Sequence, residues 1–292
     1  MATTPLRWAV LACLLSLSTI ATTFPSPSYA QAPAAARRSA DASEAFFAAN
    51  QLRASGQRIA RLYLETGAGV RPNRTRVMLE QEIKSYEQLL DGLLRERNDK
   101  TLQKHVARVE EAWKELKPMV TSPFGRDRAE LVYSLSEQLY IQTAKATTYL
   151  EDRAQSEAGY LSDVAGRNAA FAERIAKAAF LFSITRKSGS LVDFETWKKE
   201  YTDGYERLEK SELNDDYARA NLRLGRMMWV MFDATLSEII KKNDTTRMLD
   251  IAKSVDGMWE IAQSSKKQYE VMFRQQMKQG NQLASQPPQK GS

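Results

Sequence analysis

The sequence predicts an all-α protein made of two tandem units of about four helices each, packed as up-and-down bundles. Apolar residues recur three and four positions apart through most of the 292-residue chain, and no stretch alternates convincingly with a period of two. Glycine and proline, which interrupt helices, number only 13 and 9. A short basic segment also occurs twice, with Arg58 and Arg174 placed 116 positions apart. A repeat of this length indicates two copies of one helical unit.

The repeated segment is both basic and amphipathic. Its first copy extends from Ala49 to Leu64 and its second from Ala165 to Phe180. Several residue pairs keep the same offset of 116 positions: Ile59 and Ile175, Ala60 and Ala176, Arg61 and Lys177, Trp113 and Trp229. Because the tryptophans lie far from the segment, the constant offset favours repetition of a whole helical unit.

The first unit is expected to occupy residues 41–157. Gly67 and Pro72 end its first helix, a turn at Asn98 follows the second, and Pro123 ends the third. The periodic apolar positions predict helices over residues 41–64, 76–94, 102–113 and 131–149.

The second unit, residues 158–277, repeats this plan. Its basic segment lies on a helix that ends before Ser188, and Asn214 with the acidic residues after it is typical of a helix N-cap. Helices are expected over residues 162–185, 191–208, from the cap to 240, and 243–277. Only isolated glycines interrupt the pattern between the units, so the last helix of the first unit is able to continue into the next. The polar residues 278–292 predict a disordered tail.

The first thirty residues have the pattern of a secretory signal peptide. A positive Arg7 precedes an apolar stretch from Trp8 to Ile20, and small residues precede a cleavage site after Ala30. We therefore expect export to a bacterial periplasm, followed by a flexible leader at residues 31–40. The alternative is an uncleaved segment that anchors the protein in the inner membrane. Cys13 is the only cysteine, so the processed chain would form no disulfide.

The composition argues against several functional classes. The net charge of +6 arises from 42 basic and 36 acidic residues interleaved along the chain, without the basic stripe expected of a nucleic-acid-binding protein. His105 is the only histidine, and no metal-ligand cluster, P-loop, dinucleotide fingerprint or nucleophile elbow is visible. We therefore predict no enzyme, metal or cofactor. The methionines around Trp229 are expected to belong to the core.

The arginines of the repeated segment are the remaining candidates for chemistry. Arg53, Gln57 and Arg61 share one helix face, and so do Arg167 and Arg174. A guanidinium group binds carboxylate, phosphate or nitrate in a bidentate manner. If the two helices faced each other, their arginines could enclose one small oxyanion. The alternative is that the arginines pair with nearby glutamates.

The segment resembles the signature of the type IV pilus chemotaxis transducer (PilJ-type) N-terminal domain, a relative of nitrate/nitrite (NarX-type) sensor modules. That signature is approximately A-G-R-Q-R-M-x-S-Q-R-M-A-K-x-Y-L. The first copy matches it at Ala49, Arg53, Gln57, Arg58, Ala60, Tyr63 and Leu64, and the second at Ala165, Gly166, Arg167, Arg174, Ala176 and Lys177. Over both units the resemblance covers nearly all of the expected processed chain.

The resemblance implies an all-helical extracytoplasmic sensory module that acts with a membrane sensor or a pilus-associated protein. In nitrate-sensing members, facing helices hold the anion with an arginine whose place is Arg53 here. Ala169 occupies the corresponding place in the second unit. A site would therefore combine Arg53 with Arg167, or the Arg53 residues of two chains in a homodimer.

From these observations we predict an exported helical sensory or binding module for a small, nitrate- or nitrite-like oxyanion. The candidate ligand-binding residues are Arg53, Gln57, Arg58, Arg167 and Arg174. The alternative is a non-catalytic structural or protein-interaction bundle that binds no small molecule.

Overall fold

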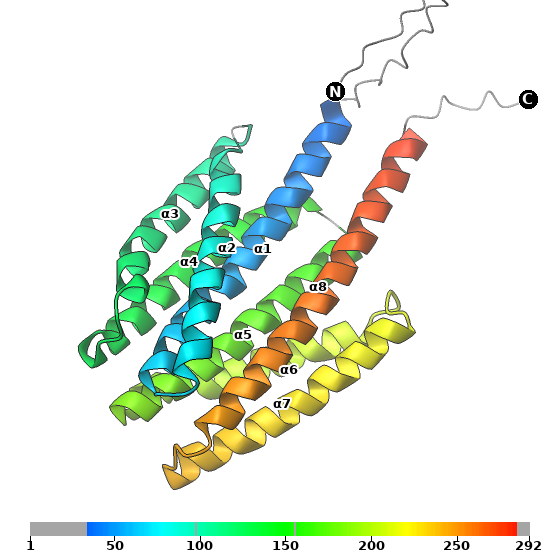
Figure 1. Cartoon of the computed structure of the whole chain (residues 1–292). Coiled ribbons are helices and arrows are strands. Elements are labelled where there is room, and N and C mark those ends of the chain that lie inside the picture. Colours follow the sequence, from blue (N-terminus) through cyan, green and yellow to red (C-terminus); the bar gives the residue numbers. More distant parts are fainter. Residues whose placement is uncertain (1–33, 97, 155, 285–292) are drawn as a thin grey trace, which may run out of the picture. The chain divides into compact units, whose positions relative to one another are not determined.

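The described part of the protein is all-α, which confirms the predicted fold class. A computed structural model describes residues 34–284 except 97 and 155, and these residues form eight α-helices, two short 3₁₀ helices and no strand. Four α-helices precede residue 155 and four follow it (Figure 1). The predicted signal peptide and cleavage site lie outside the described residues. No helix of the described part is long and apolar enough to cross a membrane.

The helices follow one another with short connections. In chain order they are α1 (Ala34–Gly67), α2 (Pro72–Leu94), α3 (Lys100–Thr121), α4 (Ala129–Ala154), α5 (Glu157–Thr185), α6 (Phe194–Lys210), α7 (Asp216–Lys242) and α8 (Met248–Ala284). The 3₁₀ helices are Arg126–Arg128 before α4 and Ser188–Leu191 before α6.

Short polar residues begin three of these helices. The carboxylate of Asp99 accepts hydrogen bonds from the amides of Thr101 and Leu102 at the start of α3. At the start of α7 the cap is Asp215, one residue after the predicted Asn214. Ser156 caps α5. A capping side chain satisfies amides that lack a partner in the first turn, so α4 and α5 are separate helices and not the continuous one that the pattern allowed.

Two helices extend beyond their predicted ends. α1 already begins at Ala34, inside the expected leader, and α8 continues to Ala284, inside the expected tail. Both extensions are rich in alanine, lysine, glutamine or leucine, which are strong helix formers. A segment without a periodic apolar face can therefore still continue a helix that packing has already established.

α1 and α5 are the central helices of the arrangement. α1 packs most extensively against α5, α2 and α4, whereas α5 packs against α8, α1 and α6. From residue 52 to 64 and from 174 to 182 of these two helices, only Arg174 is not classed as buried. Because both helices are covered on all sides, neither has the single apolar stripe of a surface helix.

The second four helices repeat the packing of the first four. The neighbours α1–α2, α1–α4 and α3–α4 correspond to α5–α6, α5–α8 and α7–α8. Two aromatic pairs also correspond: the ring centroids of Trp113 and Tyr86 lie 4.4 Å apart, and those of Trp229 and Tyr201 lie 4.2 Å apart. The offset of 116 positions between the tryptophans thus recurs in how the tryptophans are packed.

Candidate functional site

The two copies of the repeated segment face each other across the α1–α5 interface, where the helices run in parallel. Near one end the Asn50 side-chain amide donates to the Ser162 carbonyl at 2.9 Å, and further along Lys177 donates to the Gln57 side chain at 2.6 Å. Gly166 allows a close approach, because a Cβ at this position would lie only 1.9 Å from Asn50 Oδ1. The arrangement of helices that an enclosed oxyanion requires is therefore present.

Two of the candidate arginines meet at one carboxylate, that of Asp163 on α5. Arg53 Nη2 lies 2.8 Å from Asp163 Oδ1, and Arg167 Nε lies 2.8 Å from Asp163 Oδ2. Arg53 also donates to Asn50 Oδ1 at 2.9 Å and to the Asp163 carbonyl at 3.1 Å. Arg53 and Asp163 are buried, whereas the Arg167 side chain is 32% exposed. A planar group with two oxygens thus already lies between the two guanidinium groups.

This cluster of Asn50, Arg53, Ser162, Asp163 and Arg167 is called the Asp163 site below. Arg53 Nε and Ser162 Oγ are buried without a hydrogen-bond partner among the described residues, and so is Asp163 Oδ2, which Arg167 approaches as an ion pair. A buried donor without a partner is costly and is usually satisfied by water or a bound group. The Asp163 site therefore retains hydrogen-bonding capacity that the chain itself does not use.

A third cation lies close to the Asp163 site. Lys266 of α8 is buried, and its pKa is lowered by burial and also by the nearby charge of Arg53, although Glu270 opposes the shift. Lys266 lies 3.5 Å from Glu270 and donates to Gln51. Arg53, Arg167 and Lys266 thus face Asp163 and Glu270, an excess of one positive charge that favours a further anion.

Gln57 and Arg174 belong to a second cluster, around Lys177. The ammonium group of Lys177 donates to Gln57 at 2.6 Å, to Ser136 Oγ at 2.7 Å and to Glu137 at 2.6 Å. Arg174 forms a two-nitrogen contact with the same Glu137 carboxylate. Its guanidinium group also lies 4.3 Å from the ring centroids of both Tyr140 and Trp197, an arrangement typical of cation–π contacts.

The charges of this second cluster shift one another's pKa values. Burial lowers the pKa of Lys177 to about 8, although Glu137 partly opposes the shift. Burial alone would raise the pKa of Glu137, but the charges of Lys177 and Arg174 outweigh it and hold the pKa at about 2. Glu137 is therefore the shared counter-ion of two cations, and no donor of Lys177 remains available to a ligand.

Arg58 lies in a third cluster together with Arg61. Arg58 Nη1 is 2.9 Å from Glu173 Oε1, and its guanidinium carbon lies 4.5 Å from the Trp259 ring centroid. Arg61 Nε is 2.8 Å from Glu173 Oε2. Arg61 also pairs with Glu65 four residues later, as the glutamate-pairing alternative predicts for this segment. Arg61, Glu65 and Glu173 are fully buried.

The third cluster is completed by residues outside the repeated segment. Arg71 pairs with Glu65 at 2.6 Å and with Asp256 at 2.9 Å, and Asp256 also lies 2.9 Å from Arg61 Nη2. Burial would raise the pKa of Asp256, but Arg61, Arg58 and Arg71 lower it. Burial opposes the charge of Arg61, yet the surrounding carboxylates raise its pKa. Each of the three arginines thus forms ion pairs with carboxylates of the chain, and Arg58 also lies 3.4 Å from Glu82.

Sequence reasoning located the basic half of these clusters and missed the acidic half. Asp163, Glu173, Glu137 and Asp256 hold the candidate arginines, but none was singled out. A signal existed for Glu173, because it lies 116 positions after Gln57 inside the second copy of the repeated segment. Asp256 and Glu137 lie on α8 and α4, and only the packing of these helices on α5 and α1 brings them to the clusters.

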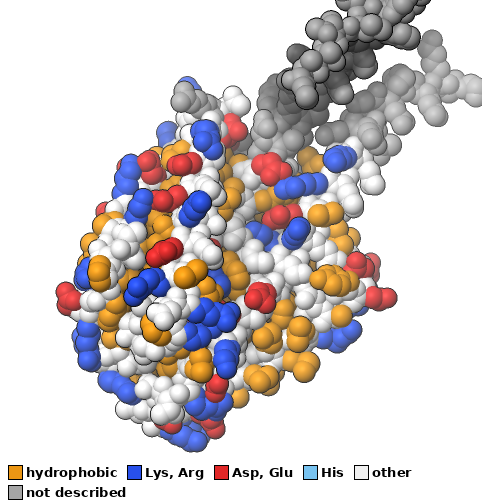
Figure 2. Space-filling view, viewed as in Figure 1, with side chains coloured by type: hydrophobic (Ala, Val, Ile, Leu, Met, Phe, Trp, Pro, Cys, Tyr) orange, Lys and Arg blue, Asp and Glu red, His pale blue; other side chains and the backbone are white. Residues whose placement is uncertain are grey.

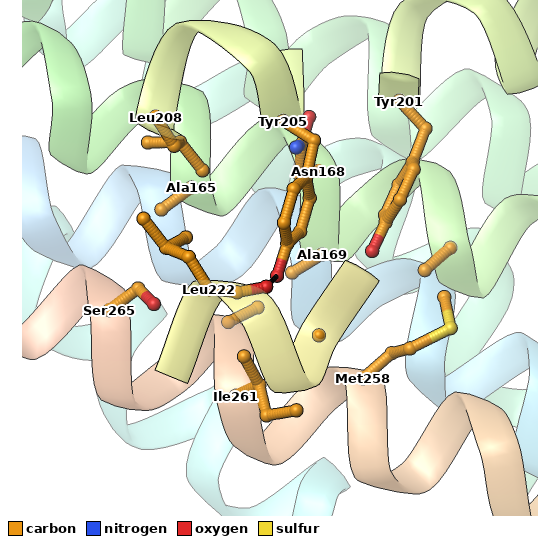
Figure 3. A pocket seen from close by; sticks show the side chains of 13 residues that line it. Ala165, Asn168, Ala169, Tyr201, Tyr205, Leu208, Leu222, Met258, Ile261 and Ser265 are labelled. Carbon is orange, nitrogen blue, oxygen red and sulfur yellow. Dashed lines mark hydrogen bonds between the residues drawn. The ribbon is translucent and has the colours of Figure 1, made fainter. Parts of the chain in front are cut away.

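A small cavity lies away from these arginines, among α5, α6, α7 and α8 (Figure 3). Its volume is about 10 Å³, comparable to one water molecule, and none of the five candidate residues lines it. Tyr205 closes one side and donates to the Leu222 carbonyl at 2.9 Å (Figure 3). This cavity is too small for an organic ligand.

Two of the methionines around Trp229 lie outside the core, contrary to the expectation from the sequence. Trp229 is buried, but Met227 and Met231 are 64% and 66% exposed. Met227 and Met231 are about one turn apart and share one face of α7, whereas Trp229 lies on the opposite face.

No protein-family model, curated protein or solved structure matches the chain. The interpretation of the clusters therefore depends on their own geometry.

Proposed function

We propose that the chain is an exported, non-catalytic helical sensory module that binds a small planar oxyanion, of nitrate or nitrite type, at the Asp163 site. One observation carries this proposal. Arg53 and Arg167, one from each copy of the repeated segment, converge on a single carboxylate, and Arg53 Nε still lacks a partner among the described residues. Carboxylate and nitrate are both planar and anionic, so a site that holds the first suits the second.

Binding at this site would occur from the side of Arg167, which reaches the surface, towards the buried Arg53. The oxyanion would accept hydrogen bonds from Arg53 Nε and Ser162 Oγ, two donors of the Asp163 site that lack partners among the described residues. The excess positive charge of Arg53, Arg167 and Lys266 over Asp163 and Glu270 would compensate part of the repulsion from Asp163. The resemblance to PilJ-type modules supports the same ligand class, and a membrane sensor or pilus-associated partner would transmit the signal.

The proposal is tested by thermal unfolding with and without millimolar nitrate, nitrite, sulfate and small carboxylates. At about 100 times its Kd a ligand that binds only the folded state adds about 2.7 kcal/mol, and we expect a rise of roughly 5 °C in Tm. The rise should disappear in Arg53→Ala and in Arg167→Ala. Arg108→Ala, which removes an exposed arginine of α3, is the matched control and should keep it. A Tm that no anion changes would refute the proposal.

The second candidate function is a structural or protein-interaction bundle without a small-molecule ligand. A specific observation favours it: Arg58, Arg61 and Arg174 are already paired with carboxylates of the chain. In this case the repeated segments only hold α1 and α5 together. Substitution of Arg53 would then lower the Tm by the same amount in every buffer, whichever anion is present.

A further inference from the structure

α7 carries a second apolar face that nothing in the described part of the chain covers. Its first face, with Leu222, Trp229 and Phe232, is buried against the rest of the protein. A surface helix needs only one such stripe. On the opposite side large apolar side chains are exposed by half or more: Tyr217, Leu224, Met227, Val230 and Met231. Apolar side chains gather over the lower right of the surface, where α7 and α8 lie (Figure 2).

The exposed positions follow the spacing of a coiled-coil seam. Intervals of three and four residues alternate without a break through Tyr217, Ala220, Leu224, Met227, Met231 and Ala234, all of which are exposed or partly exposed. This alternation keeps side chains facing a partner helix. The seam is about 25 Å long at 1.5 Å per residue. A contiguous apolar stripe of this kind on a soluble surface typically marks an interaction site. The α7 seam is the name used below for these six residues.

We propose that the α7 seam binds the α7 seam of a second copy of this chain, in antiparallel orientation, to form a symmetric dimer. Charge complementarity supports a second copy as the occupant. α7 has Asp215 and Asp216 at its beginning and Lys241 and Lys242 at its end. Two antiparallel copies bring the acidic end of each helix to the basic end of the other, which also agrees with the helix dipoles.

One register satisfies both the charges and the shapes. When Asp216 lies opposite Lys242 of the second copy, Met227 lies opposite Met231 and Leu224 lies opposite Ala234, while Tyr217 and Ala220 lie opposite Lys241 and Glu238 beyond the end of the seam. A large side chain thus meets a small one, as interdigitated packing requires, and flexible methionines meet at the centre. Because the contacts are reciprocal, the same surface serves both subunits of a two-fold dimer.

The area of the α7 seam determines how tightly the two copies are expected to bind. A single helix seam is smaller than the roughly 800 Å² per partner of a standard stable interface. The dimer is therefore reversible, and its population rises with protein concentration. Sedimentation velocity over a hundredfold range of protein concentration measures this directly.

Three variants distinguish the α7 seam from other surfaces. Met227→Glu combined with Met231→Glu places charges at the centre and should weaken association by at least roughly tenfold, because burying unpaired charges is unfavourable. Ile141→Glu changes an apolar residue of α4 with similar exposure and should leave association unchanged. Lys242→Glu should also weaken association, and Asp216→Lys added to it should restore the dimer.

A loss of association can be distinguished from unfolding of a variant. All substituted side chains are exposed, and circular dichroism together with the Tm shows whether each variant is folded. A monomer at every concentration overturns the proposal. So does a dimer that persists in the double glutamate variant, since that dimer would use another surface. Failure of the charge exchange to restore association overturns the antiparallel register. None of these results depends on anion binding at the Asp163 site.

Discussion

Arg61 and Glu173 form a completely buried ion pair between α1 and α5, with 2.8 Å between Nε and Oε2. The contact between Lys177 and Gln57 is its counterpart. Arg61 and Lys177 are equivalent positions of the two copies, 116 residues apart, and so are Gln57 and Glu173. In both contacts the residue at the Arg61 position of one copy therefore binds the residue at the Gln57 position of the other. Two parallel helices related by an approximate two-fold rotation make reciprocal contacts of this kind.

The buried Glu173 carboxylate should be a major determinant of stability. Glu173→Ala removes one of the two carboxylates that Arg58 and Arg61 share, and breaking a buried ion pair from one side typically costs about 3–5 kcal/mol. We therefore expect the free energy of unfolding, measured in urea, to fall by about that amount. Glu195→Ala removes a glutamate whose side chain is 86% exposed, so its effect should stay within about 0.5 kcal/mol. Equal effects of the two substitutions would contradict the importance of the buried network.

The close approach of α1 and α5 at Gly166 gives a second prediction. A Cβ at this position would lie 1.9 Å from Asn50 Oδ1, so Gly166→Ala should destabilise the protein by about 1–3 kcal/mol through overpacking. A Cβ at Gly92 of α2 would meet no described atom outside its own helix within 4 Å. Gly92→Ala should therefore stabilise the protein by about 0.5–1 kcal/mol through helix propensity.

The clash at Gly166 involves the side chain of Asn50 alone among the nearest atoms. Because the clash involves one side chain, Asn50→Ala should relieve part of the cost of Gly166→Ala, and a double-mutant cycle from urea unfolding measures this coupling. Additive effects of the two substitutions would mean that the helices do not meet at this point.

Sequence reasoning was sufficient for the helices because their determinants are local. Capping residues such as Asp99, breaks such as Gly67 and Pro72, and the apolar period act over a few neighbouring positions. The predicted start of α1 and the predicted end of α8 were wrong. In both places residues that favour helices continue the helix to Ala34 or Ala284 without a periodic apolar face. Such ends depend on the packed part of the helix, which local patterns do not describe.

The candidate site was predictable only in part, because its acidic residues come from several helices. The resemblance to PilJ-type modules implied a site that combines Arg53 with Arg167 or with Arg53 of a second chain, and in the structure Arg53 and Arg167 both contact Asp163. The sequence did not indicate that Asp256 of α8 would pair with Arg61, across 195 positions. Three-dimensional packing also exposes Met227, although a cluster of methionines next to a tryptophan usually lies in a core.

Glu137 makes stability depend on pH in the acidic range. Its pKa in the folded protein is about 2, below the ordinary 4.5, so the unfolded chain binds a proton first as the pH falls. The stabilisation is complete above about pH 4.5 and is lost towards pH 2. Between pH 5 and 3 we expect a loss of about 2 kcal/mol from this group.

Comparison with a variant isolates this contribution from the other carboxylates. Glu137→Gln should lower stability at pH 5 and make the loss between pH 5 and 3 smaller by about 2 kcal/mol than in the unsubstituted protein. Urea unfolding at the two pH values measures both quantities, and Glu195→Gln serves as the exposed control. If Glu137→Gln and the unsubstituted protein lost the same stability, Glu137 would not be the counter-ion of Lys177 and Arg174.

Removal of Asp163 should strengthen the binding of small anions at the Asp163 site, because the carboxylate that competes with them is then absent. Asp163→Ala leaves two arginines facing each other without the carboxylate that separates them, and an uncompensated buried charge of this kind costs about 3–5 kcal/mol. Formate, nitrite and nitrate have the size and planarity to occupy the vacated position. We therefore expect each of them, at millimolar concentration, to raise the Tm of Asp163→Ala more than chloride does at equal ionic strength.

The comparison with chloride matters because general screening by salt also relieves repulsion between arginines. A planar anion adds directional hydrogen bonds to that screening, and its effect should saturate with concentration as binding does. Adding Arg167→Ala to Asp163→Ala should abolish the difference between planar anions and chloride, since one of the two guanidinium groups is then missing. Equal rises in Tm with chloride and nitrate would mean that the two arginines lack the geometry to hold a planar oxyanion.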